Sequence, residues 1–373
     1  MRRTGIANLP LHGGKCPRWL FDRMTRLSKA ITEVIIHEYS QEEFLRRLTD
    51  PYWFQAFSCA IAFDWHSSGV STTLLGALKT AVEPEEMGIA ICGGKGKASK
   101  RTPDDIEKNS ETFSLSTKKI ENLKKSSKLA AKVDNAAVQD GFYLYHHCLI
   151  MTERGEWAVI QQGMNPQKQY ARRYHWLGGE VRSFVEEPHH AICCDSTGKT
   201  LNMVAKESKG SRKACVDLAG ESPEWIIRLT RQIKNGAQRT LNDFDMLPVL
   251  EMPKRHRVLL EDINLKQIRQ ILLRTYEEKI EDFEQLLGMR GVGPATVRSL
   301  ALLSDLIYGE EPSFTDPCRY SFCLGGKDGF PYKPNLEHYE KVIETLSDSI
   351  RQAKLGNRDR LNAIKRINAL INQ

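Results

Sequence analysis

The chain has 373 residues, of which 40% are hydrophobic and 27% charged, and its formal net charge is +7. This length exceeds the usual size of one compact domain, so we expect two packed domains. No apolar run approaches the roughly 20 residues that span a bilayer, and the first residues carry no apolar signal-peptide core. These features exclude the membrane-spanning and secreted classes, and we expect a cytoplasmic protein with no membrane partner.

The first predicted elements are helices. Amphipathic periodicity predicts helices over residues 19–39 and 41–63, the second interrupted at Pro51. Ser and Thr at the start of 67–82 predict a third helix, and the apolar run 87–94 predicts a buried strand that ends in a glycine turn. Helices followed by a buried strand are typical of a fold in which helices cover a sheet.

A Lys-rich stretch follows this strand. From residue 93 to 132 the chain carries eleven Lys or Arg against five Asp or Glu, and its pattern predicts solvated helices. Such a surplus favours a polyanionic partner through counterion release. Lys95 and Lys97, in a glycine-rich loop, are candidate phosphate contacts, while a solvated helical face without a ligand is the alternative.

The middle of the chain is β-like. Residues 142–151 and 157–165 are rich in aromatic and β-branched residues, and with the turn at 153–156 they predict a β-hairpin. A third run, over 181–194, is predicted to extend this sheet.

The composition changes near residues 217–223, and the sequence beyond is helical in pattern. Ser222 can cap a helix that has Pro223 at its first position. We therefore predict an α+β protein: an α/β domain with a mixed sheet over residues 1–218, followed by an all-α domain over 219–373.

The strongest local motif lies at 281–309, where two apolar-periodic helices flank a Gly-Val-Gly turn. Both turn glycines permit positive φ, and Pro294 starts the next helix where its missing N–H costs nothing. Amides at a helix start can hold a phosphate oxygen without reading sequence. The residues expected at such a contact are Arg290, Gly291, Val292, Gly293, Ala295, Thr296 and Arg298, together with Lys95 and Lys97.

This segment resembles the helix-hairpin-helix family of DNA-binding motifs, which implies DNA as the partner. In the DNA glycosylases of that family a catalytic Asp follows the second hairpin glycine by a little over twenty residues, and Asp316 lies at that place. The resemblance implies that Asp316 acts beside an extruded nucleotide. Ala295 stands where bifunctional members have a Schiff-base Lys. An ordinary αα-hairpin, and a plain helix cap at Asp316, are the alternatives.

A second group of candidate residues lies in and after the β-hairpin. Strand alternation separates His146 from His147 and Gln161 from Gln162, so that one His and one Gln can share a face with the arginines. His, Arg and amide groups suit phosphodiester chemistry, with His as nucleophile or general acid and Arg as a clamp on the charge. The candidate catalytic residues are His147, Gln161, Arg172, Arg173, His175, Glu187 and His189.

Two alternatives to that interpretation stay open. A divalent metal such as Mg²⁺ or Mn²⁺ could be held by Glu187, His189 or Asp140. Each residue, taken singly, is more simply a hydrogen-bonded structural group.

The layout of this region also resembles the His, strand, turn, strand, Gly-x-Asn pattern of the phospholipase D superfamily. His147, Gly163 and Asn165 occupy the matching places, whereas Leu149 replaces the Lys of that pattern. The resemblance implies phosphodiester cleavage with an incomplete catalytic set.

Eight short segments are spread along nearly the whole chain: HGGKCPRWL, DWHSSGVSTTLLGALK, GGKGK, QDGFYLYHH, VIQQGMN, ARRYHW, EPHHAI and SFTDPCRYSFCLGGKDG. Through them the chain resembles the prokaryotic family called domain of unknown function 763. This resemblance implies one coherent architecture and no particular activity.

The expected function is that of a DNA-processing enzyme. A nuclease, which is a hydrolase of phosphodiester bonds, acting in DNA repair is the first hypothesis. A helix-hairpin-helix glycosylase centred on Asp316 is the second, and a noncatalytic DNA-binding adaptor is the third. A homodimer is among the oligomeric states open to it.

Overall fold

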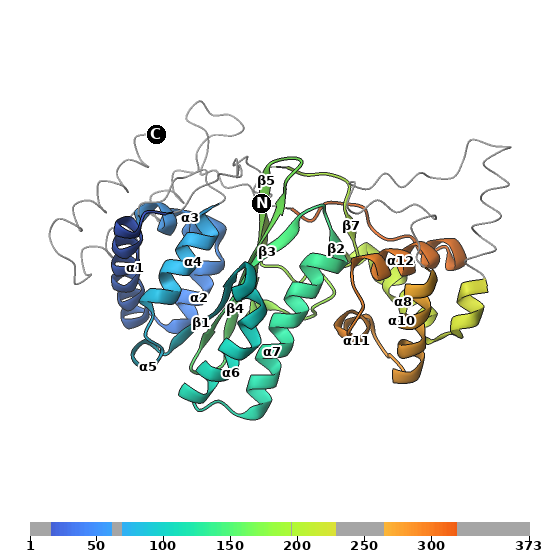
Figure 1. Cartoon of the computed structure of the whole chain (residues 1–373), viewed down its shortest axis with the longest axis horizontal. Helices are drawn as coiled ribbons and strands as arrows, with labels where there is room; N and C mark the ends of the chain where they lie inside the picture. The colour runs from blue at the N-terminus through green and yellow to red at the C-terminus, as the bar shows by residue number, and fades with distance from the viewer. Residues whose placement is uncertain (1–15, 62–68, 195, 229–264, 319–373) are drawn as a thin grey trace.

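A five-stranded antiparallel sheet with the strand order β1-β3-β4-β5-β6 lies at the centre of the computed structural model (Figure 1), which describes residues 16–61, 69–194, 196–228 and 265–318. A separate two-stranded sheet pairs β2 with β7. The strands are β1 (Ile89–Lys95), β2 (Val138–Gln139), β3 (Tyr143–Thr152), β4 (Trp157–Asn165), β5 (Tyr170–Leu177), β6 (Ala191–Cys193) and β7 (Leu201–Asn202).

The helices before β1 cover one face of the large sheet. They are α1 (Arg18–Glu38), α2 (Gln41–Thr49), α3 (Pro51–Ala60), α4 (Gly69–Ala81) and α5 (Pro84–Met87). Pro51 ends one helix and starts the next, as the sequence predicts, because Asp50 caps α3. Its Oδ1 accepts hydrogen bonds from the amides of Tyr52 and Trp53 at 2.8 and 3.0 Å.

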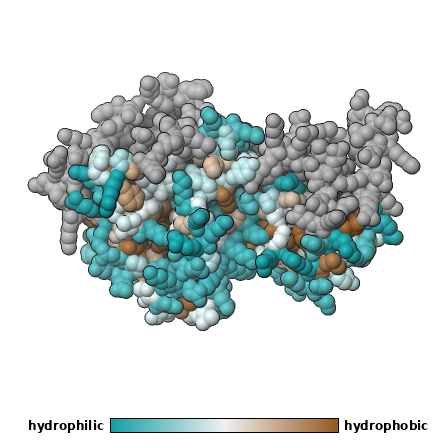
Figure 2. Space-filling model, in the orientation of Figure 1, coloured by the Kyte–Doolittle hydropathy of each residue, from teal (hydrophilic) through white to brown (hydrophobic). Residues whose placement is uncertain are grey.

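The Lys-rich stretch after β1 is helical, as predicted, and lies on the other side of the sheet (Figure 1). It consists of η1 (Gly96–Arg101), α6 (Thr102–Thr112), α7 (Thr117–Lys132) and the π-helical turn η2 (Val133–Ala137). The face of the molecule that Figure 2 shows is mostly hydrophilic around these helices.

The remaining described helices follow β5 in the chain. They are η3 (Gly178–Glu180), η4 (Lys206–Ser208), α8 (Lys209–Gly220), α10 (Leu265–Glu278), α11 (Phe283–Gly288) and α12 (Pro294–Tyr308), with a further helical segment at 223–228. The last part of the predicted all-α domain, from residue 319 onwards, lies outside the described residues.

The α+β class is confirmed, with two differences in detail. The sheet is antiparallel throughout rather than mixed, because α6 and α7 return the chain to the edge of β1 in the opposite direction. In addition, only 191–193 of the run 181–194 is a strand, and β5, which was not predicted, lies between β4 and β6.

Both faces of the sheet are buried, so adjacent residues of one strand enter different cores. Ile150 and Ile160 belong to a cluster with α1–α4, whereas Leu149 and Val159 belong to a cluster with α6 and α7. This alternation decides where every polar side chain on the central strands lies.

The second cluster continues into the helices after the sheet. It contains Leu149 of β3, Leu218 of α8 and Leu286 of α11. The predicted domain boundary at 218/219 falls within α8, and the division into two domains stays a prediction. No helix among the described residues is both long and apolar enough to cross a membrane.

Candidate functional site

The register of the central strands separates the predicted catalytic residues. One rung pairs His147 with Gln161 and Gln161 with Tyr174, and the next rung pairs His146 with Gln162 and Gln162 with Arg173. Directly paired residues point to the same face of a sheet. His147 and Gln161 therefore face α7, while Arg173 lies on the opposite face, where its guanidinium stacks over Phe54 of α3 at 4.4 Å.

On the α7 side, His147 and Gln161 belong to a chain of hydrogen bonds. Ser127 Oγ lies 2.8 Å from His147 Nε2, and His147 Nδ1 lies 2.9 Å from Gln161 Oε1. The Gln161 amide then donates to Asp134 Oδ2 at 2.5 Å. Ser127 and His147 are 5% and 7% exposed, which leaves a small part of each at the surface.

These contacts fix the protonation of His147. Because a carboxylate only accepts, Asp134 requires the NH₂ group of Gln161, and the Gln161 oxygen is then left to accept from His147 Nδ1–H. Nε2 is therefore the acceptor for the Ser127 hydroxyl. Burial lowers the pKa of His147, and the contacts with Gln161 and Asp134 oppose this effect. A hydroxyl, a neutral imidazole and an orienting amide form the arrangement of an activated nucleophile.

Asp134 reaches this chain because the helix changes its winding. α7 ends at Lys132 and continues as the π-helical turn η2, which carries Asp134. π-turns are rare and occur often at functional sites. The carboxylate also accepts from Trp176 Nε1 at 3.0 Å and lies 2.5 Å from His189 Nε2. It therefore links β4, β5 and the segment before β6 to the end of α7.

Arg172 is on this face as well but has a different environment. Its guanidinium donates to both carboxylate oxygens of Asp316 at 3.0 and 2.8 Å and to Asp140 at 3.0 Å. Burial lowers the pKa of Arg172, but the two carboxylates outweigh it and the pKa lies well above its usual value. Arg172 is thus held by Asp140 and Asp316, two other candidate residues.

The opposite face holds Arg173 and His175. Both are fully buried, and the His175 ring meets Phe54 edge-on at 5.5 Å. Burial lowers the pKa of Arg173 to about 10, against the effects of Cys193 and Tyr145. Burial, and then Arg173, lower the pKa of His175 well below its usual value. The sheet thus separates these two from His147.

The remaining predicted catalytic residues are placed apart from one another. Glu187 is at the surface with φ +43° and lies 3.3 Å from Lys206 Nζ. His189, as described above, pairs with Asp134. Among the described residues no group of three or more His, Cys, Asp or Glu could hold a metal ion, so the ligands considered for Mg²⁺ or Mn²⁺ do not meet.

The two other residues of the phospholipase D pattern have local roles. Gly163 lies against Phe142, whose Cβ would be 2.9 Å from an added Cβ. Asn165 accepts the amides of Gln167 and Lys168 at 3.1 and 3.0 Å, which closes the turn after β4. Neither contact involves His147.

The turn between α11 and α12 has the conformation expected of its first glycine only. Gly291 has φ +95°, whereas Gly293 is extended with φ −141°. A Cβ at Gly293 would meet nothing within 4 Å. Arg290, Gly291 and Ala295 are exposed, whereas the side chains of Val292 and Thr296 are buried, at 1% and 3% exposure. The turn is thus anchored by Val292 and open elsewhere.

Lys132 holds this turn from the inside. Its ammonium donates to the carbonyl oxygens of Val292 and of Met289, the latter at 3.2 Å. Burial and the neighbouring Lys128 lower the pKa of Lys132. The carbonyl side of the turn is therefore occupied by the protein itself.

Other cations surround the turn. Arg274 donates to the Arg290 carbonyl at 3.4 Å, and Arg298 donates to Gln139 Oε1 at 2.8 Å. Arg274, Arg290 and Lys128 are exposed. Lys95 and Lys97, which the sequence predicts at the same contact, lie instead at the end of β1 and in η1, where both are exposed, and the Lys95 ammonium is 6.0 Å from the Tyr145 ring centroid.

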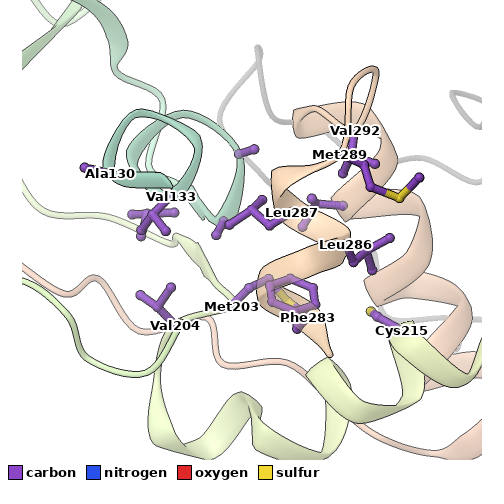
Figure 3. Packing of buried hydrophobic residues seen from close by; sticks show 14 of the residues in the cluster. Ala130, Val133, Met203, Val204, Cys215, Phe283, Leu286, Leu287, Met289 and Val292 are labelled. Carbon is purple, nitrogen blue, oxygen red and sulfur yellow. The ribbon is translucent and has the colours of Figure 1, made fainter. Parts of the chain in front are cut away.

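The two helices of the turn pack mainly on their neighbours, although the sequence predicts a self-supporting hairpin. Phe283, Leu286, Leu287, Val297, Leu300 and Ala301 are buried as predicted. However, α11 contacts α7 and α8, and α12 contacts α8 and η2. Figure 3 shows Phe283, Leu286 and Leu287 between these elements, near Val133 and Cys215. α11 has only six residues, too few to support a partner helix alone.

Three residues of these sites were not predicted: Ser127, Asp134 and Lys132. Ser127 lies within α7, whereas Asp134 joins the chain of hydrogen bonds through the π-helical turn η2, which no residue pattern in the sequence indicates. The sequence holds no sign for Lys132 either, because its partner carbonyls lie more than 150 residues away.

A family model described as a protein of unknown function (DUF763) matches residues 5–334. No curated protein and no solved structure matches the chain.

Proposed function

The chain belongs to the DUF763 family of proteins of unknown function, and we propose that it binds the phosphate backbone of DNA through the turn between α11 and α12. One observation carries this proposal. Lys132 occupies the carbonyl side of the turn, while Arg290, Gly291 and Ala295 are exposed on the other side.

The start of α12 supplies the anion contact. The first amides of a helix have no intrahelical acceptor. The N-cap residue of α12 is Gly293, which has no side chain to cap them. Pro294 removes one donor, so Ala295 and Thr296 provide the amides that face a ligand. Oriented amides with the helix dipole behind them bind phosphate without reading bases.

The surrounding charge favours the same ligand. Lys128, Arg274 and Arg290 are exposed near the turn, and cations that neutralise phosphates release condensed counterions. The acidic side chain on this part of α11, Glu284, lies 2.7 Å from Lys125 Nζ, which offsets its charge.

An added carboxylate tests this proposal. In Ala295→Glu the new charge favours the α12 dipole, so folding is expected to be retained, yet it repels a phosphate at the same amides. We expect duplex DNA affinity to fall at least tenfold. Leu306→Glu, at the other end of α12, is the matched control and should bind normally. Equal affinities of the two variants, measured by fluorescence anisotropy, would remove the turn from the interface.

Phosphodiester hydrolysis is a second candidate function, favoured by the contacts of His147. Its Nε2 accepts from Ser127 while Gln161 orients the ring, so His147 can take a proton from a nucleophile. We propose that this nuclease chemistry, in a DNA repair context, uses His147 as the base.

A product assay separates the two functions. Labelled single-stranded, double-stranded and branched DNA would be incubated with the wild type and with His147→Gln, with and without Mg²⁺ or Mn²⁺. If the wild type cleaves the DNA and the variant does not, although both bind it with the same affinity, hydrolysis at His147 is supported. If the wild type binds DNA but cleaves none, only the noncatalytic adaptor function remains.

A further inference from the structure

The chain of hydrogen bonds through His147 runs from the interior of the protein to its surface. Asp134 and Gln161 are fully buried, whereas His147 and Ser127 keep 7% and 5% of their surface exposed. The carboxylate therefore lies at the inner end of this chain and the serine hydroxyl at its outer end. A ligand approaching from solvent meets the hydroxyl and the imidazole before the other two groups.

Both ring nitrogens of His147 are engaged in this chain. Nδ1 donates to Gln161 Oε1, and Nε2 accepts from the Ser127 hydroxyl. The proton that Nε2 can take is thus the one on Ser127, and a water molecule would first have to displace that hydroxyl. A histidine that attacked a substrate itself would need a free lone pair, which Nε2 already uses. The contacts therefore favour Ser127 as the nucleophile over both water and His147.

The same chain can stabilise the cation that forms when His147 takes this proton. The imidazolium keeps its Nδ1–H on Gln161 Oε1, and the Gln161 amide donates to Asp134 at 2.5 Å. Burial lowers the pKa of His147, whereas Gln161 and Asp134 raise it, so both groups favour the charged ring. A hydroxyl on an imidazole that a third group orients is the general form of an activated serine.

Exposed cations lie on two elements beside this pair. Lys128 follows Ser127 in α7 and is exposed. Gly94 pairs with His147 in the register of β1 and β3, and a Cβ at Gly94 would lie 3.2 Å from η1. η1 carries the exposed Lys97. Cations near a reacting ester favour an anionic one, because they offset the negative charge that grows on its oxygens.

We propose that Ser127 attacks the phosphorus of a phosphodiester and forms a covalent phosphoserine intermediate, with His147 as the base. This role rests on the proposed hydrolysis, to which it adds the nucleophile and the intermediate.

The reaction has two balanced steps. In the first, the Ser127 oxygen bonds to phosphorus while its proton moves to His147 Nε2. The bond from phosphorus to the leaving alcohol oxygen breaks, and that oxygen takes the proton from His147. In the second, a water oxygen bonds to the same phosphorus and gives a proton to His147 Nε2. The Ser127 oxygen then leaves and takes this proton, which regenerates the hydroxyl.

Trapping of the intermediate tests this role. The full chain would be mixed with bis(4-nitrophenyl) phosphate or with labelled DNA and quenched in SDS, and peptide mass spectrometry would locate any adduct. We expect phosphorus on Ser127, and DNA that migrates with the denatured protein. A small fluorophosphonate should label the same serine, because fluoride is a good leaving group.

The neighbouring serine provides the matched control. Ser126 and Ser127 are both buried on α7, and Ser127 is the partner of His147 Nε2. Ser127→Ala should abolish the adduct and slow diester hydrolysis by at least about a hundredfold, whereas Ser126→Ala should keep the wild-type rates. His147→Gln should lose the adduct as well. Circular dichroism shows whether each variant is folded, and the mapping of the wild-type adduct needs no variant.

The outcomes separate this role from hydrolysis itself. Cleavage that Ser127→Ala retains, with no adduct in the wild type, would overturn the nucleophile and leave His147 as a base for water. An adduct on Ser127 without DNA cleavage would support the nucleophile and remove the nuclease function. Neither an adduct nor cleavage would overturn both.

Discussion

Arg172 and Asp316, which lie 144 residues apart, form a two-pronged salt bridge with Nη1–Oδ1 and Nη2–Oδ2 distances of 3.0 and 2.8 Å. Asp316 also accepts the amides of Gly198 and Cys318 at 3.0 and 2.9 Å. Arg172, predicted for a nuclease site, and Asp316, predicted for a glycosylase site, thus form an ion pair with each other. Four hydrogen bonds in all hold the Asp316 carboxylate in place.

Asp316→Asn should therefore destabilise the fold. It removes one charge of a buried pair and leaves Arg172 undercompensated, which costs about 3–5 kcal/mol in comparable cases. Urea denaturation gives the free energy of unfolding, with the exposed Glu311→Gln as control. A variant as stable as the wild type that has lost base release from damaged DNA would instead support the glycosylase hypothesis.

Lys132→Met should loosen the turn between α11 and α12. The substitution keeps the apolar stem but leaves the carbonyls of Met289 and Val292 without their donor, and an unsatisfied buried acceptor costs about 1–3 kcal/mol. Amide hydrogen exchange over residues 289–296 should become roughly tenfold faster or more. Lys128→Met, at an exposed position of the same helix, should not alter it, and equal rates in the two variants would contradict this account.

Ser127→Ala should cost more stability than Ser126→Ala. Both serines are buried on α7, at 5% and 7% exposure, but Ser127 is the partner of His147 Nε2. Its loss should lower the free energy of unfolding by about 1–3 kcal/mol, against a smaller change for Ser126→Ala. Equal effects would mean that the hydrogen bond contributes little.

Acidification should unfold the protein through its buried histidines. Their pKa values are lowered in the fold, to about 3 for His146, so below about pH 6.5 the unfolded chain binds more protons. Stability is therefore complete above that pH and is lost as the pH falls, by about 1.4 kcal/mol per unit for His146.

His146→Phe checks the size of this effect. Between pH 6.5 and 5.5 the variant should lose about 1 kcal/mol less stability than the wild type, because the unfolded histidine is only half protonated at pH 6.5. Parallel pH profiles for the two proteins would show that His146 is not neutral and buried in solution.

The sequence by itself determined the local elements and their spacing. Periodicity and Pro51 located the helices on either side of it, and the structure adds that Asp50 caps the second of them. The turn of the β3–β4 hairpin and the split between His146 and His147 follow from local rules too, since strand alternation has a fixed period. β5 was missed because its row of Arg, Tyr, His and Trp lacks an alternating pattern.

Only the tertiary structure decided which polar groups meet. Strand register placed His147 beside Gln161, and the π-turn after α7 added Asp134. The partners of Arg172 and Lys132 come from segments more than 140 residues distant. The physical reason is that hydrogen bonds and ion pairs act over a few ångströms in space, and distance along the chain does not encode that proximity.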